Sequence, residues 1–499
     1  MKRRLPNIFY NPVSLAGAAL AAACFSTIVF LTFVGLWQNK PPVYIGIVTY
    51  VALPVPLIAG ILAVAFGVWR ERRRRRSGRP ASTMVFTLDL NVSQQRRALT
   101  FFSAATVVFL LFTAYGSYRT FEYTESVQFC GETCHTVMQP EYTAYQNSPH
   151  ARVRCVDCHV GSGASWYVRS KLSGAYQVYA VLANNYPRPI PVPIKNLRPA
   201  QETCEQCHWP AFFSGEKEEL KNYFESDTQN TRWSVDLLMK VGGGGLHGPG
   251  PTRGIHWHMN IADEIDYIAS DSAEQVIPWV RARDKYTGTI TEYLSSDATE
   301  PVSDMTKRPV HMLDCIGCHN QPSHSYHPPV RLVDEALTLR KISTDLPNVR
   351  AAAIQALVTP YSGTRAALDS IPTMMQNYYN QTYPKIADEK KSLIAAASTE
   401  LKEGYRRNFF PEMNVNWKAY PDNIGHLTSP GCFRCHDGKH KAASGRMISK
   451  DCNSCHTILY QGPADKPTTL DASGLQFQHP VDVGDAWKDT NCSECHSGE

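Results

Sequence analysis

Cysteine is almost absent outside one recurring pattern. The chain of 499 residues has 15 cysteines, of which 14 belong to that pattern and only Cys24 lies elsewhere, inside an apolar run. No cysteines remain for a separate disulfide framework. Acidic residues are equally scarce at the N-terminus, where residues 1–119 hold 2 acids against 14 lysines and arginines. The glycine run at 242–245 is not followed by Lys-Ser or Lys-Thr, which argues against a phosphate-binding loop.

The recurring pattern is Cys-x-x-Cys-His, in which two thiols attach a haem covalently and the adjacent imidazole reaches the iron. Disulfides would not need a histidine after every second cysteine, and seven Cys2His units do not divide naturally into the four-ligand groups of zinc sites. The first of the seven motifs has one extra residue between its cysteines. The paired cysteines are Cys130 and Cys134, Cys155 and Cys158, Cys204 and Cys207, Cys315 and Cys318, Cys432 and Cys435, Cys452 and Cys455, and Cys492 and Cys495. The motif histidines are His135, His159, His208, His319, His436, His456 and His496.

Three apolar runs without an internal charge occupy the N-terminal quarter, at residues 13–37, 43–69 and 98–118. Each is long enough to cross a hydrocarbon core, which needs about 20 helical residues. Pro54 and Pro56 are expected to kink the second helix. A cleaved signal peptide is the alternative for the first run, but this run is longer than the usual signal core of about 7–15 residues.

Basic residues predict the orientation of these spans. Three basic residues precede the first span, and the segment 70–97 carries nine arginines, whereas the turn at 38–42 has one lysine. Positive charge stays on the cytoplasmic side, so three crossings place the haem region in the periplasm of a bacterial inner membrane. The arginine run 72–76 could contact nucleic acid, but its place between two spans favours topology and anionic lipid, with no nucleic-acid partner.

We expect a mostly α fold, with a three-helix transmembrane anchor and an irregular or helical multihaem cytochrome c domain. Four pieces are predicted: the anchor at 1–119, a four-haem domain at 120–330, a haem-free helical spacer at 331–425 and a three-haem segment at 426–499. Within the spacer, helical periodicity covers 330–341, 349–358, 364–379 and 385–408. No strand pattern dominates. From residue 120 onward there are 36 basic and 43 acidic residues, which favours basic partners.

Histidines outside the motifs are candidate second ligands to the irons. In the last segment three haems meet three such residues, His426, His440 and His479, and this match favours two histidines per iron. In the four-haem segment the candidates outnumber the irons, so some are hydrogen-bonded bystanders. His256 and His258 would face opposite ways if extended, so only one should ligate. The candidates in the four-haem segment are Met138, His150, His256, His258, His311 and His324.

Residues 130–160, with Ser148-Pro149-His150 before the second motif and an apolar helix before the first, resemble the NapC/NirT family of membrane-anchored quinol dehydrogenases. The three-helix anchor, the Cys-x-x-x-Cys-His first site and three further C-terminal sites look like the larger seven-haem inner-membrane cytochromes of metal-reducing bacteria. The family resemblance covers roughly residues 100–330, and the C-terminal segment matches by motif layout.

The resemblance implies roles for individual residues. His150 matches a family ligand of the third haem, and His311 resembles the ligand of the second. Met138 corresponds to the methionine that binds the first iron, with core packing as the alternative. Lys171 and Glu141 match residues at the quinol pocket. The family acid about two turns beyond that lysine is absent, because Gln177 and Val178 stand there.

These observations favour a protein that carries seven c-type haems, oxidises menaquinol or a related quinol from the membrane quinone pool, and transfers electrons to periplasmic cytochromes or a membrane complex. It would act as a quinol dehydrogenase in anaerobic or extracellular respiration. One alternative is an electron-relay haem subunit of a larger respiratory complex that does not itself oxidise quinol. A multihaem reductase is a second alternative, but it needs an open iron, and the many spare histidines argue against one.

Overall fold

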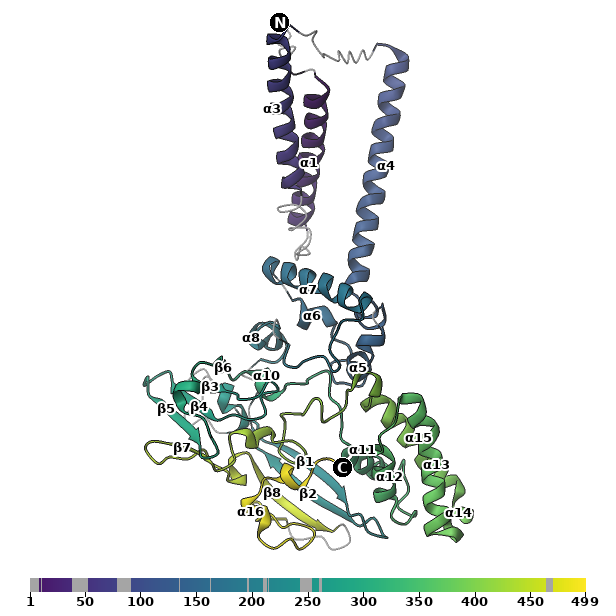
Figure 1. The fold of residues 1–499 in the computed structure, drawn as a ribbon, viewed down its shortest axis with the longest axis vertical. Coiled ribbons are helices and arrows are strands. Elements are labelled where there is room, and N and C mark those ends of the chain that lie inside the picture. The colour runs from purple at the N-terminus through teal and green to yellow at the C-terminus, as the bar shows by residue number, and fades with distance from the viewer. Residues whose placement is uncertain are drawn as a thin grey trace. The chain divides into compact units, whose positions relative to one another are not determined.

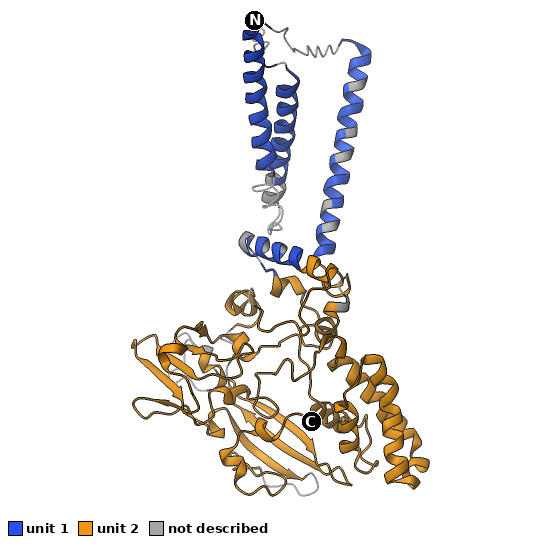
Figure 2. Ribbon diagram, viewed as in Figure 1, with its two compact units in different colours: residues 1–125, 160–176 blue, residues 126–159, 177–499 orange. Residues whose placement is uncertain are grey.

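A computed structural model describes residues 9, 11–37, 53–78, 91–133, 135–161, 163–194, 197–209, 213, 215–242, 254–259, 263–463 and 470–499. The chain separates into two compact units (Figure 2). Unit 1 comprises Met1–Glu125 and Val160–Tyr176, and unit 2 comprises Ser126–His159 and Gln177–Glu499. The helices and strands of both units are labelled in Figure 1.

Three long apolar helices dominate unit 1: α1 (Pro12–Trp37), α3 (Pro54–Arg76) and α4 (Ser93–Thr124). All three are long and apolar enough to span a membrane. The predicted kink in the second span is wrong, because α3 begins at Pro54 and its prolines occupy the first turn, where a missing N–H costs no helical bond. The earlier part of that predicted span, residues 43–52, lies outside the described residues.

The arginine run after the second span is helical, whereas the sequence suggested a loop. Helix α3 continues to Arg76, and its last turn consists of four arginines. Cations at a helix C-terminus interact favourably with the exposed carbonyl dipoles. Glu71, in the preceding turn, is buried and pairs with Arg75 at 3.1 Å.

Helices α1 and α3 pack through small residues. A Cβ atom added at Gly17 would lie 2.6 Å from the Gly60 carbonyl oxygen, so only glycine allows this approach. The Ser14 hydroxyl donates to the Val64 carbonyl at 3.0 Å. In lipid, the burial of apolar side chains does not drive two helices to associate. Close glycine contacts and an interhelical hydrogen bond are therefore typical of helix association there.

Unit 2 contains two antiparallel sheets, which the sequence did not predict. One has the order β1-β2-β8 and the other β6-β3-β4-β5-β7. The prediction of a mostly α fold is therefore correct for the helices, but it left out the two sheets. The strands are β1 (Lys217–Phe224), β2 (Arg232–Met239), β3 (Asp263–Ile268), β4 (Trp279–Asp284), β5 (Ile290–Ser295), β6 (His311–Met312), β7 (His440–Ala442) and β8 (His456–Pro463).

Each sheet joins distant parts of the chain. Strand β2 pairs with β8, so that Trp233 lies opposite Pro463, and β5 pairs with β7, so that Ser295 lies opposite His440. The C-terminal segment thus adds one strand to each sheet. Backbone hydrogen bonds therefore join residues of the predicted four-haem domain to residues of the predicted three-haem segment.

The expected haem-free helices are present and enclose the largest apolar core of the described residues. These helices are α11 (Pro329–Thr338), α12 (Val349–Val358), α13 (Thr364–Thr382), α14 (Pro384–Glu389) and α15 (Lys391–Asn408). Tyr379, Ile371 and Leu346 are fully buried among them. The Asn230 side chain, in the turn between β1 and β2, donates to the Leu346 carbonyl at 2.9 Å and connects this core to the sheet.

The remaining helices carry the haem motifs and their surroundings, and most are short apart from one of 19 residues. They are η3 (Phe129–Thr133), α5 (His135–Gln146), α6 (Cys155–His159), α7 (Ala164–Leu182), α8 (Ala200–Thr203), η4 (Cys204–Gln206), η6 (Ile255–Met259), α9 (Val302–Met305), α10 (Cys315–Cys318), η7 (Pro411–Met413), η8 (Gly431–Arg434), η9 (Cys452–Ser454), α16 (Ala486–Asp489) and α17 (Cys492–Cys495).

A buried ion pair holds the haem-free helices together. Arg350 binds Asp334 through two hydrogen bonds of 2.7 and 3.2 Å, and the two side chains are 15% and 8% exposed. Arg350→Met should destabilise this region by about 3–5 kcal/mol, because it leaves a buried carboxylate without its cation. Urea unfolding followed by circular dichroism measures the effect.

The matched control is Arg331→Met. Arg331 pairs with Glu335 at 2.8 Å, but both side chains are about half exposed. Loss of such a surface pair should cost about 0–1 kcal/mol. Equal effects of the two substitutions would contradict the assigned role of the Arg350 pair.

Candidate haem-binding sites

The cysteines of each ordinary motif are spaced by one helical turn. In α10, Asp314 caps the turn by accepting hydrogen bonds from the backbone N–H groups of Ile316 (2.9 Å) and Gly317 (3.1 Å). Residues three apart on a helix lie on one face, so both thiols of a motif can reach one porphyrin edge. Asp451 caps η9 in the same way, and Asn491 forms a capping box at α17.

The first motif has a wider turn. Its extra residue falls in η3, a π-helical segment that includes Cys130. A π-helix closes its hydrogen bonds over five residues and accommodates one residue more than an α-helix. Cys134, the second cysteine of this motif, lies outside the described residues.

Six motif histidines are each faced by a histidine from elsewhere in the chain. Metal–imidazole bonds of about 2 Å on both sides of an iron place the two ring centres about 6 Å apart. The observed spacings therefore fit a haem iron between each pair of rings. The ring-centre distances are His150–His208 5.9 Å, His159–His324 6.3 Å, His256–His319 6.4 Å, His258–His436 5.8 Å, His426–His456 6.3 Å and His479–His496 5.9 Å.

Hydrogen bonds orient five of the six facing histidines. In each, Nδ1 contacts a backbone carbonyl oxygen, which favours a proton on Nδ1 and a lone pair on Nε2 for a metal. At His479 the Val481 N–H also lies 3.3 Å from Nδ1, so there the carbonyl contact at 2.7 Å competes with a second, longer one. Burial also lowers the pKa of His324 to about 4 and lowers the pKa of His258, which favours the neutral ring. The Nδ1 contacts are His150 to Pro322 (3.0 Å), His256 to Val241 (2.7 Å), His258 to Ile255 (2.8 Å), His324 to Glu141 (2.9 Å) and His479 to Val481 (2.7 Å).

The pairing of rings differs from the sequence-based expectation at three points. His324, rather than His311, faces His159 of the second motif. His311 instead stacks on Tyr267 at 5.4 Å and lies 3.4 Å from the Glu274 carboxylate. The surroundings of His311 follow from strand β6, which places His311 opposite Tyr267 in the sheet.

His256 and His258 form the second difference, because each faces a motif histidine. They lie in the 3-10 turn η6 rather than in an extended segment, so their side chains are not on opposite faces. His440 is the third difference. Its Nδ1 lies 2.9 Å from the Asp437 carboxylate and its Nε2 lies 2.8 Å from the Ile277 carbonyl, so both ring nitrogens are engaged within the protein.

The first motif cannot be completed from the described side chains, since that of His135 lies outside them. Helix α5 begins at His135, and Met138 follows three residues later on the same face. Met138 is half-buried. Met138 therefore stays a predicted iron ligand of the first motif.

Glu141 lies one further turn along α5, in buried surroundings. Desolvation by burial raises its pKa to about 7, and its Oε2 has no hydrogen-bond partner among the described residues. Burial, and then the nearby Glu141 carboxylate, raise the pKa of Tyr326 and Tyr420. The sequence analysis missed both tyrosines, because they lie far from Glu141 in the chain.

Lys171, the other residue predicted for the quinol pocket, lies on α7, and its side chain is outside the described residues. Gln177 and Val178 follow on the same helix, and both are exposed. The structure therefore supplies a described environment for Glu141 alone.

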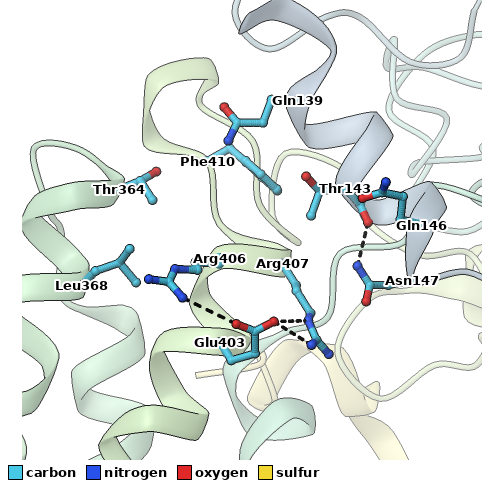
Figure 3. A pocket seen from close by; sticks show the side chains of 10 residues that line it. All are labelled: Gln139, Thr143, Gln146, Asn147, Thr364, Leu368, Glu403, Arg406, Arg407 and Phe410. Carbon is cyan, nitrogen blue, oxygen red and sulfur yellow. Dashed lines mark hydrogen bonds and ion pairs between the residues drawn. The ribbon is translucent and has the colours of Figure 1, made fainter. Parts of the chain in front are cut away.

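A polar cavity of about 460 Å³ lies on another side of α5 (Figure 3). Gln139, Thr143 and Gln146 of α5 line it, together with residues of α13 and α15. Its two arginines, Arg406 and Arg407, both pair with Glu403. Glu141 is not among the residues that line it, and its charged lining is unsuited to a quinol ring.

Comparison with known proteins agrees with the motif geometry. Residues 92–190 match the NapC/NirT cytochrome c family, N-terminal region. The chain is 41% identical over 495 residues to the cytochrome c-type protein ImcH of Geobacter sulfurreducens, covering 99% of this chain and 96% of that protein. It is also 33% identical over 78 residues to the cytochrome c-type protein NrfH of Wolinella succinogenes, covering 15% of this chain and 44% of that protein. No solved structure matches. The chain therefore belongs to the NapC/NirT family of c-type cytochromes, in the group that includes ImcH.

Proposed function

We propose that the protein is an inner-membrane quinol dehydrogenase that carries seven c-type haems. It oxidises menaquinol or a related quinol and delivers electrons to periplasmic redox partners in anaerobic or extracellular respiration. The observation that carries the proposal is the set of six facing histidine pairs, each with a covalent attachment motif beside it. The similarity to ImcH over nearly the whole chain supports it.

Haem bound at these sites supplies one-electron chemistry. The paired cysteines would hold it covalently, and the paired histidines would supply the two nitrogen ligands of its iron. Second ligands are proposed at five further sites: His324 at the second, His150 at the third, His256 at the fourth, His426 at the sixth and His479 at the seventh. At the first site, His135 and Met138 are the proposed ligands. An iron held between two imidazoles would have no open position, so the six facing pairs disfavour the reductase alternative.

Quinol oxidation releases two protons with two electrons, so the pocket needs a group that accepts a proton at neutral pH. Glu141 suits this task, because its raised pKa of about 7 makes it a stronger base than an ordinary carboxylate. We assign proton acceptance to Glu141 and binding of the quinol oxygen to Lys171, following the family resemblance. Residues 177 and 178 offer no second acid.

The basic flanks of the spans support a three-pass topology with the haem region in the periplasm. The first attachment motif follows shortly after the end of α4 at Thr124, so the chain itself keeps this site close to the membrane surface. Quinol dissolved in the bilayer would then have a short path to Glu141. Arg73 to Arg76, at the end of α3, would meet the anionic lipid of the cytoplasmic leaflet.

One observation favours the relay-subunit alternative. The most apolar part of α4 buries none of its residues within the described chain, which leaves room for another membrane protein. Stopped-flow reduction of the purified protein by a menaquinol analogue separates the two functions. We expect reduction on the enzyme timescale of about 1–10³ per second. Absence of any quinol-driven reduction, with dithionite reduction intact, would favour the relay subunit.

A further inference from the structure

The fourth and fifth attachment motifs, although more than a hundred residues apart, meet at one short turn. Within η6, His256 faces His319 of the fourth motif and His258 faces His436 of the fifth. The turn precedes both motifs in the chain. A 3-10 helix has about three residues per turn, so side chains two positions apart diverge without pointing in opposite directions.

In both rings of the His258–His436 pair, Nδ1 contacts the protein and Nε2 is the nitrogen that could bind a metal. His258 Nδ1 contacts the Ile255 carbonyl at 2.8 Å, and His436 Nδ1 contacts the Ser449 carbonyl at 2.7 Å. Each Nδ1 is thereby occupied, and each Nε2 is left for a metal. Trp257 sits between the two histidines of the turn and packs against the apolar cluster that contains Ile265 and Tyr267. The turn is therefore fixed in the core beside β3.

His440 is the rival for the fifth site, because it lies only four residues from His436. It is 1% exposed, and both its ring nitrogens contact protein acceptors, the Asp437 carboxylate and the Ile277 carbonyl. The second contact ties β7 to the residues just before β4. His440 therefore has a structural task, and neither of its nitrogens is available.

Arg434 holds the two attachment loops together. It stands between the cysteines of the fifth motif and is 8% exposed. Its guanidinium donates to the Gly317 carbonyl inside the fourth motif at 2.7 Å and to the Glu274 carbonyl at 2.9 Å. Its Nε also donates to Gly431 at 3.0 Å. One buried side chain thus fixes the fourth and fifth loops against each other.

We propose that His258 supplies the second ligand to the iron that Cys432, Cys435 and His436 would hold, so that the single turn η6 serves both the fourth and the fifth haem site. This assignment rests on the proposed function only in that haem occupies the motifs. A residue of the predicted four-haem domain would then complete a site in the C-terminal segment.

The test compares His258→Ala with His440→Gln in the full-length protein. Covalent haem is counted by the pyridine haemochrome assay, and high-spin iron is measured by electron paramagnetic resonance. We expect His258→Ala to convert one haem in each chain from low spin to high spin with no loss of covalent haem. Added imidazole should restore the low-spin signal. His440→Gln should leave every spin state unchanged.

High-spin iron in His440→Gln but not in His258→Ala would overturn the assignment, as would unchanged spectra in both. If His258→Ala loses covalent haem, His258→Met decides: a new thioether–iron charge-transfer band supports the assignment, and its absence overturns it. These readouts do not depend on quinol. Failure of quinol-driven reduction would therefore contradict the proposed function and leave the spin-state result standing.

Discussion

Glu141→Gln should slow reduction of the protein by a menaquinol analogue on the order of 10²–10⁴-fold, which is the usual cost of losing a positioned proton acceptor. The substitution keeps the shape of the side chain and removes its basicity. Reduction by dithionite should stay at the wild-type rate, since that reaction needs no proton acceptor in the pocket. Stopped-flow absorbance in the haem bands measures both rates.

The pH dependence separates proton acceptance from simple binding. Burial raises the pKa of Glu141 to about 7, so the carboxylate is mainly charged above pH 7 and mainly protonated below it. Only the charged form accepts a proton, so wild-type quinol oxidation should lose rate as the pH falls through 7. The Gln variant should lack this step in its profile. Lys171→Ala should weaken quinol binding and leave the step in place.

The matched control is Glu389→Gln, which removes an exposed carboxylate at the end of α14 in the haem-free helices. Its quinol kinetics should equal those of the wild type. Wild-type rates in Glu141→Gln would place the proton acceptor elsewhere and remove Glu141 from the pocket. A parallel loss of dithionite reduction would mean that the substitution had damaged the haem sites.

Local sequence signals predicted those features that local interactions determine. The helix at 349–358 has the predicted bounds, and α13 extends the predicted 364–379 to Thr382, because apolar spacing alone decides which face is buried. The cysteine spacing likewise predicts seven attachment motifs without the fold. In α3, the prolines were expected to kink a helix only because the sequence did not reveal where that helix starts.

Long-range pairing could not be predicted from the sequence. Strand β8 begins at the histidine of the sixth motif, and its strand character depends on its pairing with β2, more than two hundred residues earlier. The choice of His324 over His311 depends on the same kind of pairing, because β6 turns His311 toward Tyr267. The prediction that matched the three histidines of the last segment to its three haems failed at His440, because it considered only residues of that segment. The partner of the fifth motif comes from η6, in another segment of the chain.

Arg434 was also overlooked, although its position carried a signal. It is the one basic residue that stands between paired cysteines in the seven motifs. The structure buries it against Gly317 of the preceding motif. Sequence reasoning treated each motif as an independent unit, and so it did not consider a side chain of one motif as part of its neighbour.

Met138→Leu should change the absorption spectrum of one haem and shift the potential of one component in a redox titration. The shift should be on the order of 0.1 V, within the range of about 0.8 V that axial ligands impose on haem. The direction is downward if another histidine replaces the thioether, because methionine ligation raises the potential. The remaining components should titrate as in the wild type, since Met138 lies on α5 beside the first motif only.

Met413→Leu is the control for packing. Met413 is 3% exposed in an apolar cluster with Tyr326 and Tyr420, so this substitution removes a core methionine with the same change in chemistry. It should lower stability slightly and leave every haem spectrum unaltered, because volume-conserving core exchanges usually cost less than about 1.5 kcal/mol. If Met138→Leu behaves like Met413→Leu, then Met138 is a core residue, and the second ligand of the first iron must come from elsewhere in the chain.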